Sequence, residues 1–225
     1  MSGFGLGKLN GILKEDIFTE MRDFVVKCCE LMNDESITLN NPLPNHEDKI
    51  KLRLMNKYLR QPSVREKLGY KNLKLMFDAE TVENYNELTD ESNARLDIKV
   101  SSEDTLTHYD KYYTIECKRL DGYAHLNKEY VKEGISRFVS SSAKYASGYG
   151  KNLMLGFVIK NIDIKTNTNK INEIQKVELN KELKEEFKLL NEIPSRCSIY
   201  SSFYECSSRK IQLQHIFYDL SKAVS

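Results

Sequence analysis

The chain has 225 residues, of which 40% are hydrophobic and 30% are charged, a balance typical of globular proteins and too polar for a membrane protein. No segment approaches the roughly 18 consecutive apolar residues of a transmembrane helix, and the N-terminus lacks the basic and then apolar pattern of a signal peptide. We therefore expect a cytoplasmic protein without a membrane partner. The formal net charge of +1 excludes a uniformly basic surface, so any nucleic-acid binding would rest on a local patch.

The N-terminal segment is predicted to form a long amphipathic helix at residues 8–32, where apolar residues recur at helical spacing. Its apolar face either packs against the rest of the chain, which is the more common role, or mediates self-association. Two prolines in NNPLPN at 40–45 then interrupt the chain. We expect an N-terminal helical extension at 1–40 and one main domain at 41–225.

A second helix is predicted to begin after Asn45, a favourable N-cap residue that Asp48 follows three positions later. It should continue until RQPS at 60–63. Glu47 lies three residues before Ile50, which places this carboxylate on the apolar face of the helix and directs it toward the domain.

Three consecutive strands are predicted where apolar residues alternate with others, at 70–80, 94–101 and 111–120. The short polar connection at 101–110 suits an antiparallel hairpin between the last two. A helix at 125–143 and an apolar strand at 152–160 follow, which indicates a βαβ crossover with parallel strands. Gly134, in the middle of that helix, costs about 1 kcal/mol relative to alanine, and a close approach to the sheet or to substrate would explain it.

The C-terminal third is predicted to contain a charged amphipathic helix at 168–191 and two closing strands at 198–208 and 210–221. The predicted fold class is α/β, with a mixed central sheet flanked by helices. His215 lies in an apolar strand, where a structural histidine is more common than a catalytic one. The five cysteines have no metal-ligand spacing and are expected to be free thiols.

Asp97, Glu116 and Lys118 are ionisable residues inside segments that otherwise read as buried strands. In a strand, residues two apart share a face, so Glu116 and Lys118 point the same way, and pairing of the two strands brings Asp97 toward them. Two neighbouring carboxylates repel unless one is protonated or a cation lies between them. Oxygen ligands of this kind suit Mg²⁺ or Mn²⁺, and the alternative is a surface ion-pair ladder on a half-exposed sheet.

The sequence RLDI, a hairpin, IECKRL, a helix and a strand together resemble the PD-(D/E)xK nuclease superfamily, over residues 46–160. The resemblance implies a restriction-endonuclease-like fold and a Mg²⁺-dependent phosphodiesterase. Asp97 and Glu116 match its metal-binding acids, Lys118 matches its lysine, and Glu47 is placed at the acid of its first core helix. Leu96 stands where the family name has proline.

The resemblance also implies roles for these side chains. Asp97 and Glu116 would hold the metal together with the Cys117 carbonyl, and Lys118 would orient the attacking water and stabilise the transition state. Glu47 either completes the metal shell or interacts with the positive N-terminus of its own helix.

The segment 117–152 contains seven basic and three acidic residues, a local excess beside the predicted site. Its candidate substrate-binding residues are Arg119, Lys128, Lys132 and Arg137. A phosphate backbone could approach here, although lysines on a helix surface are ordinary. Arg137 either contacts a phosphate or fixes Glu116.

The sequence therefore favours a metal-dependent nuclease acting on DNA, in restriction, phage defence or repair. Two alternatives stay open: a catalytically inactive module of the same fold that binds DNA or protein, and an RNA-directed nuclease. A homodimer, or other protein subunits of a defence system, are possible partners.

Overall fold

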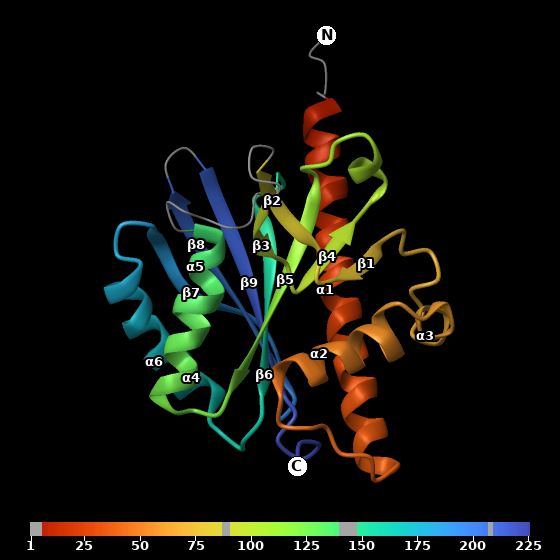
Figure 1. The fold of residues 1–225 in the computed structure, drawn as a ribbon, viewed down its shortest axis with the longest axis vertical. Helices are drawn as coiled ribbons and strands as arrows, with labels where there is room; N and C mark the ends of the chain where they lie inside the picture. The colour runs from red at the N-terminus through yellow and green to blue at the C-terminus, as the bar shows by residue number, and fades with distance from the viewer. Residues whose placement is uncertain (1–5, 87–90, 140–147, 207–208) are drawn as a thin grey trace.

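The computed structural model describes residues 6–86, 91–139, 148–206 and 209–225. A seven-stranded sheet, in the order β1–β4–β5–β6–β9–β8–β7, forms its centre (Figure 1). Its strands are β1 (Met76–Ala79), β4 (Ile98–Ser101), β5 (Tyr112–Leu120), β6 (Lys151–Val158), β7 (Leu183–Ile193), β8 (Cys197–Cys206) and β9 (Arg209–Asp219). Strands β5, β6 and β9 are parallel to one another, and the remaining pairs are antiparallel. The predicted α/β class with a mixed sheet flanked by helices is confirmed.

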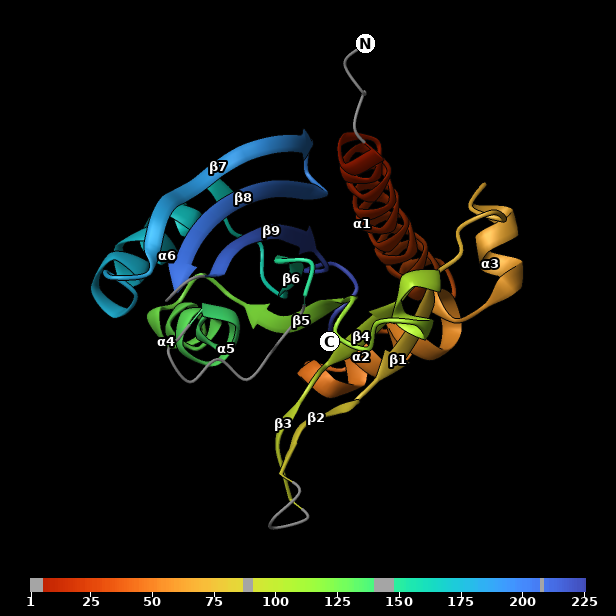
Figure 2. The same cartoon turned by 90° about the horizontal axis from the view of Figure 1, so that it is seen from above.

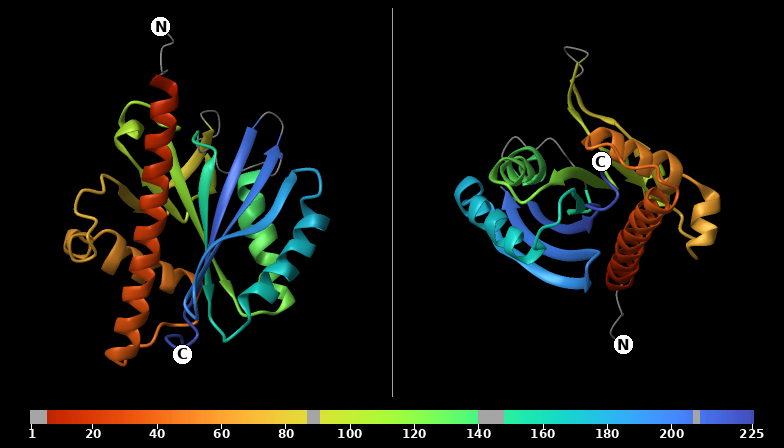
Figure 3. Two further views of the ribbon diagram at one scale, coloured as in Figure 1. Left: turned by 180° about the vertical axis from the view of Figure 1, so that it is seen from behind. Right: turned by 90° about the horizontal axis from the view of Figure 1, so that it is seen from below.

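Helices cover both faces of this sheet (Figures 2 and 3). One face carries α1 (Leu6–Thr38) and α2 (Glu47–Leu54), which continues into a π-helical turn η1 (Met55–Leu59), and the short α3 (Pro62–Lys67) lies nearby. The other face carries α4 (Ala124–Glu129), the π-helical η3 (Tyr130–Ile135), α5 (Ser136–Val139) and α6 (Ile164–Glu178). In β5, Ile115 and Cys117 pack toward the first group, whereas Tyr112 and Leu120 pack toward the second. Among the residues described, no helix is long and apolar enough to span a membrane.

The N-terminal helix packs against the sheet. It is longer than the predicted segment 8–32, and its side chains Phe18, Phe24 and Met32 are fully buried. They share one core with Ile115 and Leu155 of the central strands. The apolar stripe therefore has a partner within the chain, which is the more common of its two predicted roles.

The predicted hairpin and crossover are confirmed. Strand β4 pairs with β5 in antiparallel register, with 3-10 turn η2 (Glu103–Leu106) between them, and β5 pairs with β6 in parallel across the α4–α5 connection. The final residues of the predicted helix, 140–143, lie outside the described part of the chain.

Two predicted strands have different bounds. Residues 70–80 contribute only β1, and 94–101 is not one strand, because β3 (Glu91–Arg95) ends and β4 begins on either side of a bend at Leu96–Asp97. Strand β3 pairs with β2 (Val82–Asn86) in a separate two-stranded ribbon that the sequence did not predict. This ribbon extends away from the main sheet (Figure 2).

The predicted helix at 168–191 is wrong in its second half. Helix α6 ends at Glu178, and the following residues form the edge strand β7. Leu183 and Phe187 are half-buried there, and a spacing of four places residues on one face of a strand as well as of a helix. Register shifts along β7 disturb the simple alternation that would have identified it.

The predicted N-cap of α2 is also wrong. His46 occupies that position, without a side-chain hydrogen bond to the helix. The carbonyl and the side-chain oxygen of Asn45 instead accept hydrogen bonds from Arg119 Nη1, at 3.0 and 2.7 Å. Asn45 therefore ties the start of α2 to the end of β5.

Candidate active site

The acidic residues lie where the central sheet splits. The ladder between β4 and β5 ends at the pair Ile98 and Ile115, because the chain bends away at Asp97. The next backbone N–H group of β5 on this edge would then lack a strand partner, and a buried N–H without a partner is costly. Asp97 Oδ2 accepts the hydrogen bond from the Cys117 N–H group at 2.9 Å. Asp97 thus lies at a bend beside β5, and not inside a strand as predicted.

Glu47 has the same role two residues further along β5. Its Oε2 accepts a hydrogen bond from the Arg119 N–H group at 3.0 Å. As the first residue of α2, Glu47 also carries its negative charge at the positive end of that helix. Both interactions hold the N-terminus of α2 against the end of β5.

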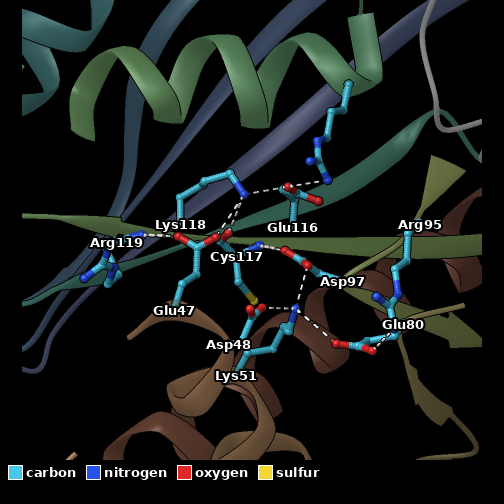
Figure 4. Close-up of polar contacts among 11 residues, drawn as sticks. Glu47, Asp48, Lys51, Glu80, Arg95, Asp97, Glu116, Cys117, Lys118 and Arg119 are labelled. Carbon is cyan, nitrogen blue, oxygen red and sulfur yellow. Dashed lines mark hydrogen bonds and ion pairs between the residues drawn. The ribbon is translucent and has the colours of Figure 1, made fainter. Parts of the chain in front are cut away.

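Lys118 joins these elements (Figure 4). Its Nζ atom lies 2.8 Å from Glu116 Oε1, 3.0 Å from the Cys117 carbonyl oxygen and 3.2 Å from Glu47 Oε1. Glu116 and Lys118 share one face of β5, as their spacing predicted. A single ammonium group is therefore placed among three oxygen atoms from α2 and β5.

Glu116 is fully buried and paired with two cations. Besides Lys118, Arg137 Nη1 of α5 lies 3.1 Å from Glu116 Oε1. Of the two predicted roles for Arg137, the structure shows the contact with Glu116. Burial, followed by the negative charge of Asp97, raises the pKa of Glu116 to about 7, and the nearby Lys118 and Arg137 limit this rise.

The second oxygen of Asp97 is bound by Lys51, which the sequence reasoning missed. Lys51 Nζ lies 2.8 Å from Asp97 Oδ1 and 2.9 Å from Asp48 Oδ1. Burial alone would lower the pKa of Lys51, but the Asp97 carboxylate reverses this and raises it above its ordinary value. The sequence feature that could have identified Lys51 is its position four residues after Glu47, which places both residues on the same helix face.

Gly134 allows the helical connection to approach the sheet at this site. A Cβ atom on Gly134 would lie 2.6 Å from Met154 Cε and 3.5 Å from Lys118 Cγ. The close approach proposed for this glycine is thus observed, and it involves the side chain of Lys118.

The four basic residues predicted to bind substrate do not form one cluster. The Arg119 guanidinium is bound to Asn45, and the Arg137 guanidinium to Glu116. Lys132 Nζ forms an ion pair with Glu178 Oε1 at 3.0 Å, and Lys128 is exposed on α4.

The predicted metal ligands converge only in part. In the described part of the chain, no three His, Cys, Asp or Glu side chains are arranged to hold a metal ion. The donor chemistry fits Mg²⁺ or Mn²⁺, since the carboxylates of Glu47, Asp97 and Glu116 and the Cys117 carbonyl are hard oxygen ligands. Three of these four groups surround the Lys118 ammonium, so a positive charge already occupies the position on which their oxygens converge.

Two further predictions concern the cysteines and His215. All five cysteines are buried free thiols, and of these Cys117 contributes its backbone carbonyl to the cluster around Lys118. His215 is a buried structural histidine, hydrogen-bonded to the hydroxyl groups of Tyr130 and Ser202. Its side chain lies outside that cluster.

Comparisons of the chain with protein-family models, with curated proteins and with solved structures found no match. The cluster itself consists of three carboxylates, one backbone carbonyl and two buried lysines, gathered at the split between β4 and β5.

Proposed function

We propose that the protein is a Mg²⁺- or Mn²⁺-dependent nuclease that hydrolyses DNA phosphodiester bonds, with the restriction-endonuclease-like fold that its sequence resembles. The observation that carries this proposal is the convergence of Glu47, Glu116 and the Cys117 carbonyl on the Lys118 ammonium, with Asp97 bound to the Cys117 N–H group. Hard oxygen donors can hold a divalent metal, and a neighbouring lysine can stabilise the negative charge that develops during phosphodiester hydrolysis.

Each of these residues would have a distinct role. Glu47, Asp97, Glu116 and the Cys117 carbonyl would hold the metal, which lowers the pKa of a bound water and polarises the phosphate when present. Lys118 carries a compact positive charge. This charge is suited to binding the attacking water and to stabilising the negative charge that develops on the phosphate oxygens. Arg137 and the Arg119 N–H group hold Glu116 and Glu47 in place.

DNA is proposed as the substrate because the segment 117–152, which contains Lys118, has more basic than acidic residues, and a phosphate backbone is recognised mainly by such charge. Restriction, phage defence and repair are the proposed contexts. The cytoplasm is the proposed location, and a second copy or other subunits are proposed partners.

One observation favours a second candidate, a catalytically inactive module of the same fold. Asp97, Glu116 and Glu47 are each bound to a lysine ammonium, so their charges are compensated within the chain. A structural ion-pair network would look the same. RNA cleavage is the remaining alternative for the active protein.

Cleavage assays separate these candidates. Supercoiled plasmid, linear duplex, single-stranded DNA and RNA are incubated with Mg²⁺, Mn²⁺ or EDTA, using the wild type, Asp97→Asn and Lys118→Met. The control is Lys74→Met, which removes an exposed lysine paired with Glu103 at 2.8 Å and distant from the site in the fold. Metal-dependent DNA cleavage that only the two site variants lose supports the proposal. Cleavage of RNA alone, or DNA binding without cleavage, would replace it with one of the alternatives.

A further inference from the structure

Lys51 is a buried cation that binds Asp97, and the proposed function takes Asp97 as a metal ligand. Only 3% of its surface is exposed. Its Nζ atom contacts Asp97 and Asp48, and lies 4.0 Å from Glu80 Oε1 at the base of the β2–β3 ribbon. Asp97 is the acid that Lys51 shares with the site around Lys118.

Both oxygens of Asp97 are engaged in this structure (Figure 4). Lys51 Nζ binds Oδ1, and the Cys117 N–H group binds Oδ2. Each carboxylate oxygen has two lone pairs, so one remains on each oxygen for a further ligand. Lys51 therefore fixes the orientation of the carboxylate and opposes, with its positive charge, the attraction of a metal ion to Asp97.

The charges of the network nearly balance. Its acidic side chains are Glu47, Asp48, Glu80, Asp97 and Glu116, and the basic side chains paired with them are Lys51, Arg95, Lys118 and Arg137. Five acids against four bases leave a single net negative charge for an entering divalent cation, since the Arg119 guanidinium is bound to Asn45. Removing one buried positive charge would change this balance more than removing an exposed one, because screening by water is weaker inside the protein.

We propose that Lys51 is a positioning residue that sets the divalent-cation affinity of the site, because its ammonium competes with the metal for Asp97. This inference rests on the proposed function, since it takes Asp97 as a metal ligand. It assigns Lys51 a role distinct from that of Lys118, which faces Glu116 and Glu47 and not Asp97.

The test is Mn²⁺ binding measured by calorimetry in the absence of nucleic acid. Lys51→Met, which removes the charged Nζ atom and keeps an unbranched side chain that is one atom shorter, should lower the Mn²⁺ dissociation constant at least tenfold. Lys51→Arg keeps the charge and should stay within about threefold of the wild type. The matched control is Lys176→Met, since Lys176 also bridges two carboxylates, at 2.9 and 3.2 Å, on the exposed surface of α6 and β7.

Asp48→Asn provides a second measurement if Lys51→Met does not fold. The Asp48 side chain is 57% exposed and pairs with Lys51. Without the Asp48 charge, the Lys51 ammonium should interact more strongly with Asp97. Mn²⁺ binding should then weaken.

The outcomes distinguish the inference from the proposed function. If the wild type binds Mn²⁺, Asp97→Asn does not, and Lys51→Met binds with unchanged or lower affinity, Lys51 does not compete and the inference alone is refuted. Unchanged or tighter binding by Asp48→Asn refutes it in the same way. If neither the wild type nor Lys51→Met binds Mn²⁺, both the inference and the metal-dependent function are refuted.

Discussion

Acid should destabilise the protein through His215. Its ring nitrogens contact the Tyr130 hydroxyl at 2.9 Å and the Ser202 hydroxyl at 2.7 Å, and its ring lies 4.3 Å from the centre of the Phe187 ring. Burial in these surroundings lowers the pKa of His215 from 6.5 to about 3. The folded protein therefore holds this imidazole neutral at pH values where an unfolded chain would protonate it.

The magnitude follows from proton linkage. Because the folded pKa lies below the unfolded one, this contribution to stability is fully present above pH 6.5 and is lost as the pH falls toward 3. Well below pH 6.5 the loss approaches about 1.4 kcal/mol per pH unit. Between pH 7.5 and pH 5.0, this single group should therefore lower the free energy of unfolding by about 2 kcal/mol.

Urea denaturation of the wild type and of His215→Gln at the two pH values measures the effect. Other groups titrate in both proteins and cancel in the difference, as does the constant cost of the substitution. The free energy of unfolding of the wild type minus that of His215→Gln should be about 2 kcal/mol smaller at pH 5.0 than at pH 7.5. His125→Gln, at an exposed histidine, should keep the wild-type dependence. A difference that is the same at both pH values would refute the account.

Three further substitutions test the packing around the site. Gly134→Ala should destabilise the protein by about 1–2 kcal/mol despite better helix propensity, because its Cβ would overlap Met154 Cε, and denaturation should show a smaller cost in a Met154→Val background. Arg137→Met should cost about 2–3 kcal/mol at pH 8 and less at pH 5, where Glu116, with its pKa raised to about 7 by burial, is protonated and needs no cation. Asn127→Ala removes both hydrogen bonds of a buried amide pair with α6 and should lower unfolding stability by about 1–3 kcal/mol, whereas an exposed control, Lys128→Ala, should change it by less than about 0.5 kcal/mol.

The central strands were predictable because their burial leaves a simple pattern. Alternation in 111–120 and the apolar run at 152–160 correspond to β5 and β6, and the connection between them fixes their parallel direction. The edge strand β7 was not predictable in this way. It is mostly exposed and bulged, and its half-buried residues Leu183 and Phe187 have a spacing of four that also fits a helix.

The acidic residues of the candidate site were predicted from the sequence, but the contacts that join them to other residues were not. Asp97, Glu116 and Lys118 stood out because charges are costly in strands. The bend at Asp97 and its contact with Lys51 were not apparent from the sequence. Both depend on where the pairing of β4 with β5 ends. Lysine four residues after Glu47 on a helix is common, and only the tertiary contact with Asp97 distinguishes it.

The same contacts explain why these acids serve the fold as well as the proposed chemistry. Asp97 and Glu47 accept hydrogen bonds from Cys117 and Arg119, peptide N–H groups that lost their strand partner where the sheet splits. Their carboxylates are therefore positioned by the backbone before any ligand arrives. A partly buried charge held this way is stabilised by a cation, and Lys51 and Lys118 supply one on each side of β5. The acids satisfy the N–H groups that the split in the sheet leaves without a strand partner, and the lysines compensate the charges of the acids. Together they form a preorganised polar site.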